Sequence, residues 1–97
     1  MDSSRMIPLG DLRARSVMYW LPPGGRDNGV FATMWVVLAE LESDDATAVL
    51  DLLADADVGG YAVTPKGPHG AGCQHVYVDT EQYNRAVDVL MLFLRGR

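Results

Sequence analysis

The run Ala32–Leu41 most limits what this chain can fold into, because it is apolar on both of its alternating sets of side chains. The sets are Met34, Val36 and Leu38, and Trp35, Val37 and Ala39. Alternate side chains of a strand point to opposite faces, so a strand that is apolar on both needs cover on both. The run therefore predicts a central strand, and a length of 97 residues fits one domain built around it.

A helix is expected directly after this strand. Ser43 is a favourable N-cap, and the helix should run from Asp44 to about Asp57 before Gly59 and Gly60 end it. The apolar residues at helical spacing are Ala46, Val49, Leu50, Leu53 and Ala56. Asp51 and Asp55 fall on the opposite side, where a solvated face is the expected role and a partner surface is the alternative.

Three further strands are predicted, at Ser16–Leu21, Tyr61–Thr64 and Gln74–Val78, and residues 1–15 form an irregular N-terminal arm. The resulting order is strand, strand, helix, strand, strand, helix. It predicts an α+β fold, a permuted ferredoxin-like two-layer sandwich of residues 16–97, with an antiparallel sheet and two helices on one face. The first strand would lie beside Ala32–Leu41.

The final helix begins after a cap at Asp79 or Thr80 and runs almost to the end of the chain. Its core-facing stripe is expected to be Tyr83, Ala86, Val87, Leu90 and Leu94. The helix is apolar nearly all round, so Met91, Leu92 or Phe93 needs a second cover. Either the N-terminal arm or a second subunit can supply it, and the sequence predicts a homodimer with these three residues at the interface.

Charge and cysteine content narrow the functional classes. The net charge is −5, and the eight Lys and Arg residues are scattered, so neither nucleic acid nor a membrane surface is an expected partner. No apolar stretch approaches the roughly 20 residues that cross a bilayer. Cys73 is the only cysteine, which excludes an intrachain disulfide and favours the reducing cytoplasm.

The glycine-rich loop before the Gln74–Val78 strand is the candidate ligand-binding segment. Its candidate residues are Lys66, Gly67, His69, Gly70 and Gly72. Glycines permit close backbone approach, and the Lys and His side chains could meet an anion or a partner. The loop leads into a strand, unlike phosphate-binding loops that open a helix, so a plain hairpin connection is the alternative.

His69, Cys73, His75 and Asp79 have the chemistry of metal ligands, but their spacing matches no known metal signature. Catalysis by Cys73 would need an adjacent base such as His75. We expect no metal site, no catalytic residue and no cofactor. A small metal- or thiol-dependent enzyme centred on His69, Cys73 and His75 is the alternative, as is an accessory subunit of a larger assembly.

Tyr19, Trp20 and Trp35 could stack on a ligand, but aromatic residues in strands mostly serve packing, so no site is assigned to them.

From Met34 onward the chain resembles the small bacterial signal-transducing protein domains, which are similar in fold to PII-like regulators. The resemblance rests on the segments Leu-Leu-Ala-Asp-Ala-Asp, Val-Gly-Gly-Tyr-Ala-Val and His-Val-Tyr-Val-Asp, and it covers about two thirds of the chain. It implies a regulatory or ligand-sensing module and carries over no functional residue. The predicted function is therefore a small non-catalytic regulatory or interaction domain that binds a protein partner or a small molecule.

Overall fold

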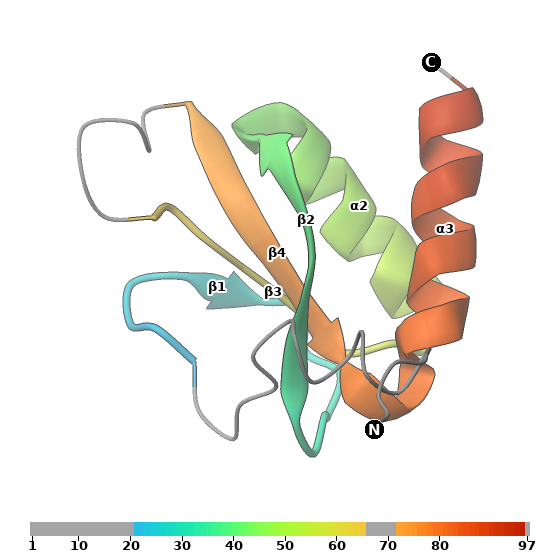
Figure 1. The fold of residues 1–97 in the computed structure, drawn as a ribbon, viewed down its shortest axis with the longest axis horizontal. Helices are drawn as coiled ribbons and strands as arrows, with labels where there is room; N and C mark the ends of the chain where they lie inside the picture. The colour runs from blue at the N-terminus through green and yellow to red at the C-terminus, as the bar shows by residue number, and fades with distance from the viewer. Residues whose placement is uncertain (1–20, 66–71, 97) are drawn as a thin grey trace, which may run out of the picture.

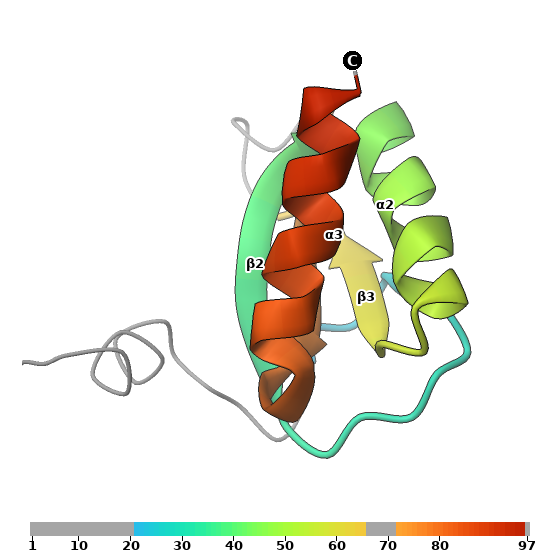
Figure 2. The same ribbon diagram turned by 90° about the vertical axis from the view of Figure 1, so that its right-hand side faces the viewer.

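The computed structural model describes residues 21–65 and 72–96, and its sheet and helices form two layers (Figure 1). The elements are β1 (Arg26–Asp27), β2 (Trp35–Glu42), α2 (Ser43–Asp55), β3 (Gly60–Val63), β4 (Cys73–Asp79), the 3₁₀ turn η3 (Thr80–Gln82) and α3 (Tyr83–Arg95). Figure 2 shows α2 and α3 side by side, running in opposite directions on one side of the sheet. The α+β sandwich with two helices on one face is confirmed.

The strands are ordered β1-β3-β4-β2, and every neighbouring pair is antiparallel. β4 thus lies between β2 and β3, the two strands that α2 connects, which is the split arrangement of a ferredoxin-like unit. β2 is an edge strand of the described sheet, not the central strand expected. The strand predicted at Ser16–Leu21 lies outside the described residues except for Leu21, so its place beside β2 stays a prediction.

A β-bulge accounts for part of the apolar character that β2 shows on both sets of side chains. Its register with β4 shifts between Val37 and Ala39, so one extra residue enters the strand there. Val36, before the bulge, and Leu38, at the bulge, are buried in the core. Ala39 and Leu41, which follow the bulge, are partly buried and pack against the same core. Because a bulge reverses the alternation of faces, both sets contribute to the helix side of the sheet.

The ends of α2 differ from the sequence expectation. The N-cap is Glu42 rather than Ser43. The backbone N–H of Ser43 instead donates to the Gly72 carbonyl oxygen at a distance of 3.0 Å. The helix ends at Asp55, and Asp57 takes the left-handed conformation with φ of 62°. Val58 N–H donates to the Leu53 carbonyl, which closes a Schellman motif in which aspartate occupies the usual glycine position.

The core lies between α2 and the sheet. Leu53 is the largest fully buried side chain in the described part, and Val49 of the same helix is also fully buried. Their neighbours from the sheet are Val36, Ala62, Val76 and Val78. The predicted apolar stripe of α2 is therefore confirmed, and both Asp51 and Asp55 are exposed as a solvated face requires.

α3 buries much less of itself than α2 does. Ala86 is its one fully buried residue, and Tyr83, Val87, Leu90 and Phe93 pack against the core beside it. Leu94, which was expected on the core-facing stripe, is 43% exposed, because Phe93 rather than Leu94 packs against the core at this end of the helix. Asp79 caps the 3₁₀ turn η3 that leads into α3, since its carboxylate accepts from the Glu81 N–H, whereas the N-cap of α3 itself is Gln82.

Asn28 ties the loop after β1 to the rest of the fold. Its amide nitrogen donates to the carbonyl oxygens of Val58 at 2.9 Å and Leu50 at 3.2 Å. Its amide oxygen accepts from the N–H groups of Gly60 and Val30, at 3.0 and 3.2 Å. The sequence analysis predicted no strand here, whereas the structure places the short strand β1 against β3 and anchors the loop through the Asn28 side chain.

Candidate functional site

Of the five predicted ligand-binding residues, the structure describes only Gly72. Lys66, Gly67, His69 and Gly70 lie outside the described residues, so that site stays a prediction. Gly72 has a φ of +81° and lines an open pocket of about 400 Å³ with Cys73 and the first residues of α2. Glu42 and Asp44 also line this pocket, so its described wall is acidic rather than suited to an anion.

The candidate ligands on β4 do not converge. Cys73, His75 and Asp79 are separated by even numbers of residues, so they fall on one face of the strand, opposite the core residues Val76 and Val78. At roughly 3.3 Å per residue, Cys73 and Asp79 lie about 20 Å apart along the strand, too far to share one ion. Within residues 21–65 and 72–96, no group of three His, Cys, Asp or Glu residues could hold a metal.

An aromatic pocket lies on the helix-free side, between the start of β2 and the loop after β1. Its volume is about 430 Å³, and its walls include Phe31, Trp35 and Tyr61. The rings of Trp35 and Tyr61 are tilted by 57° with centroids 6.3 Å apart, while Phe31 is 84% exposed at the mouth. Asp27 adds a carboxylate to the same pocket. We call this the aromatic pocket.

Hydrogen bonds hold the Tyr61 ring in place. Its hydroxyl donates to the Pro22 carbonyl oxygen at 2.5 Å and accepts from the Gly25 N–H at 2.9 Å. A Cβ at Gly25 would come within 2.6 Å of the Tyr61 ring, so glycine is needed for this close approach. Because its hydroxyl is bound to the backbone, Tyr61 offers its ring rather than its hydroxyl to the pocket.

The loop that carries Phe31 lies directly on the backbone of Gly59. A Cβ at Gly59 would be 2.9 Å from the Val30 carbonyl oxygen and 3.0 Å from the Ala32 Cβ. The turn before it is held by Asp27, whose Oδ1 accepts from the Gly29 N–H at 2.8 Å. The wall of the aromatic pocket is therefore fixed from both ends.

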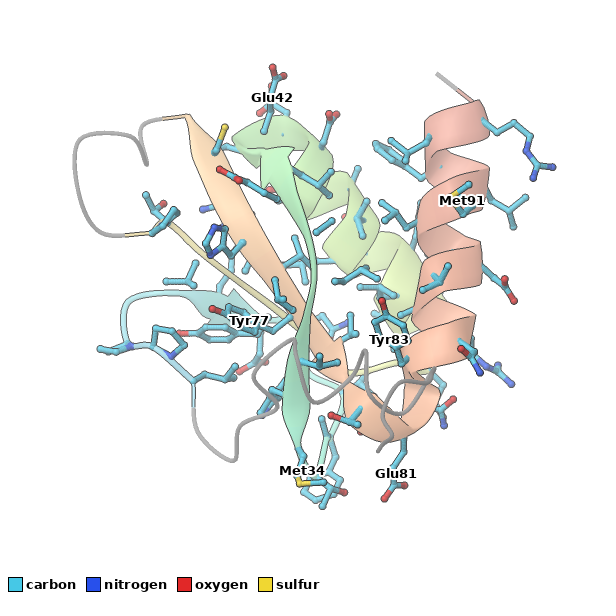
Figure 3. All side chains as sticks on the ribbon, viewed as in Figure 1. Met34, Glu42, Tyr77, Glu81, Tyr83 and Met91 are labelled. Atoms are coloured by element: carbon cyan, nitrogen blue, oxygen red, sulfur yellow. The ribbon has the colours of Figure 1, made fainter. Side chains whose placement is uncertain are left out.

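Tyr77 occupies the middle of the helix-free face. It lies between Val37 of β2 and Tyr61 of β3 in the strand register, and Figure 3 shows its ring on the side of the sheet away from the helices. The Tyr77 ring also lies edge-on to the His75 ring, with the two ring centroids 6.5 Å apart. Burial raises the pKa of the Tyr77 hydroxyl above the ordinary 10.0, and the nearby Tyr61 raises it further.

This pKa shift predicts a loss of stability at alkaline pH. The folded state holds the Tyr77 proton more tightly than the unfolded state, so its contribution is complete below pH 10.0 and declines as pH rises through the raised pKa. Urea unfolding at about pH 8 and about pH 11 should show a smaller alkaline loss in Tyr77→Phe than in the parent protein. An equal loss in both would contradict the assignment.

Sequence reasoning placed Trp35 in a packing role and singled out neither Phe31 nor Tyr61. Phe31 lies in a segment without periodicity, and Tyr61 comes from a strand 30 residues later in the chain. The usable signal was the presence of Asp27, Phe31 and Trp35 within residues 27–35.

No family model matches this chain, and comparison with curated proteins and with solved structures found no match. The likeness to signal-transducing domains therefore stays a prediction. In the described part of the chain, no helix is long and apolar enough to cross a membrane.

Proposed function

We propose that this chain is a small non-catalytic regulatory or interaction domain that works as a homodimer in the cytoplasm. The observation that supports this proposal is the outer face of α3 near the end of the helix, where Met91, labelled in Figure 3, is 50% exposed and the neighbouring Leu92 is 63% exposed. Adjacent apolar side chains left uncovered on a helix are typical of an interaction surface. Phe93, the third predicted interface residue, is half-buried and packs against the core.

The charges around this patch favour a second copy as its occupant. Asp88, Met91, Leu92 and Arg95 follow the helical spacing of one stripe, and all four are exposed. Asp88 precedes Met91 by three residues, and Arg95 follows Leu92 by three. Two copies of α3 paired antiparallel about this centre would bring each Asp88 opposite the partner's Arg95, with Met91 against Leu92 between them.

The alternative of a thiol- or metal-dependent enzyme has less support. Cys73 and His75 are neighbours on one strand face, and Cys73 is a half-buried free thiol. The third residue of that proposed centre, His69, lies outside the described residues. The exposed apolar and charged residues of α3 form a self-complementary surface, whereas the described part of the thiol centre holds only Cys73 and His75. This comparison favours a homodimer over an enzyme.

Sedimentation equilibrium over a wide range of concentrations tests the homodimer. The interface is small, so we expect reversible dimers with a dissociation constant of about 10–500 µM. Leu92→Ser should weaken association at least about ten-fold, because each dimer loses two buried leucine side chains. Leu52→Ser is the matched control, since Leu52 is a 39% exposed leucine on α2 and should leave association unchanged.

Charge reversal tests the antiparallel register. Asp88→Arg and Arg95→Asp should each weaken the dimer by about 3–10-fold at low salt, and the double variant should recover most of the parent affinity. A parent protein that stays monomeric at high concentration would refute the homodimer. A double variant no better than either single variant would refute the register alone.

A further inference from the structure

The aromatic pocket has the composition of a site for an organic cation. Three of its walls are the side chains of Phe31, Trp35 and Tyr61, which are the residue types whose ring faces attract a cation. A cation binds a ring when it lies within about 6 Å of the ring centroid. The Trp35 and Tyr61 centroids are 6.3 Å apart, a direct ring–ring contact that leaves no room between the rings, so a cation within reach of both lies beside the pair, in the pocket that both rings line.

Asp27 supplies the negative charge that such a site needs. Its Oδ1 is held by the Gly29 N–H, which orients the carboxylate, and the side chain is exposed at the pocket. The loop carries no Lys or Arg between Asp27 and Trp35, and the whole chain has a net charge of −5. Cations are therefore favoured over anions at this pocket, both locally and at longer range.

The walls also distinguish a methylated ammonium from a simple one. Besides the rings, the pocket is lined by Val30 and Leu21, and the Tyr61 hydroxyl is already bound to the backbone. Among the side chains that line the pocket, only the Asp27 carboxylate remains as an acceptor, which is too little to replace the water around a primary ammonium. A trimethylammonium group donates no hydrogen bonds and has an apolar surface, so it loses less on entering.

We propose that the aromatic pocket binds a trimethylammonium group, carried either by a free quaternary amine or by a trimethylated lysine side chain. The volume of about 430 Å³ is ample for such a group and lies within the range of small-molecule sites. Phe31 is exposed at the mouth, where its ring is available to the bound cation. This site goes beyond the proposed homodimer and uses none of the α3 residues, so either proposal can fail without the other.

Titration with choline, followed by amide and indole chemical shifts of the labelled protein, tests the site. We expect saturable shifts at Asp27, Phe31, Trp35 and Tyr61 with a dissociation constant of about 1–10 mM. The neutral isostere 3,3-dimethylbutanol, in which carbon replaces the charged nitrogen, should bind about ten-fold more weakly. An N-acetyl trimethyllysine amide that binds more tightly than choline would identify a methylated protein as the source, and the reverse order would identify a free amine.

Two conservative variants separate the cation site from general apolar binding. Phe31→Leu keeps an apolar, exposed side chain and should weaken choline about three-fold, while Asp27→Asn should weaken it about 3–10-fold. Both variants should keep the amide spectrum of a folded domain. Equal binding of choline and its neutral isostere, or no shifts at the pocket up to the highest soluble choline concentration, would overturn the proposal.

Discussion

Replacing Asn28 with alanine should destabilise the domain by about 2–4 kcal/mol, since four hydrogen bonds disappear at once. The Val58 and Leu50 carbonyl oxygens and the Gly60 N–H would all lose a partner in a partly buried place. For a domain of this size, such a loss corresponds to a fall in Tm of roughly 10–25 °C. Thermal and urea unfolding monitored by circular dichroism would measure both quantities.

Asn84→Ala is the control for this change. Asn84 is exposed on α3, so the same substitution there should alter stability by no more than about 0.5 kcal/mol. Asn28→Asp gives a second comparison, because it retains the oxygen that accepts from Gly60 but replaces the donor that faces the Val58 carbonyl. A loss below about 1 kcal/mol in Asn28→Ala would show that the loop is anchored by other means.

Replacing Gly59 with alanine should cost about 1–3 kcal/mol, because the new Cβ would press on backbone rather than on a movable side chain. The carbonyl oxygens of Val30 and Phe31 lie 2.9 and 3.1 Å from its position. The loop must move outward to relieve this contact. We therefore expect both a lower unfolding midpoint and altered amide shifts at the wall of the aromatic pocket.

Gly96→Ala is the matched control for Gly59→Ala. A Cβ at Gly96 would lie 3.5 Å or more from its nearest neighbours, which is ordinary contact, so stability should change little. Choline titration of Gly59→Ala then connects stability with the site, since a displaced Phe31 should weaken binding. Unchanged stability and unchanged amide shifts in Gly59→Ala would contradict the close packing between this glycine and the loop.

Asn28 and Gly59 act on the same segment from different sides. Asn28 draws the loop toward α2 and β3 through hydrogen bonds, and Gly59 lets the backbone of Val30 and Phe31 come close to β3. The position of Phe31 thus depends on two residues that do not line the pocket. A rigid scaffold of this kind is what a small exposed binding site requires, because its few contacts cannot also order the loop.

Local patterns in the sequence were sufficient for the elements with a regular period. The apolar spacing of Val49, Leu50 and Leu53 predicted the inner face of α2, and the alternation of Val76 and Val78 with His75 and Tyr77 predicted β4. These patterns work because helix and strand geometry repeat every few residues, so the positions that face the core can be read along the chain. The cap at Asp79 is equally local.

The ends and irregularities of these elements depended on distant residues. The backbone N–H of Ser43 donates to the Gly72 carbonyl oxygen, and Ser43 does not cap α2. The bulge in β2 is defined only by the pairing of β2 with β4. The inner stripe of α3 turns toward Phe93 because the helix settles against a particular sheet. None of these contacts leaves a periodic trace in the sequence.

The sequence by itself determined the class of fold: an α+β domain with two amphipathic helices, set by periodic apolar residues that must be buried. Only the tertiary structure decided the candidate site. Strand register brings Tyr61 to Trp35, and the side chain of Asn28 sets the loop that carries Phe31. Periodicity states which side of an element faces the core, whereas a pocket depends on which residues of distant elements become neighbours, and pairing and packing alone establish that.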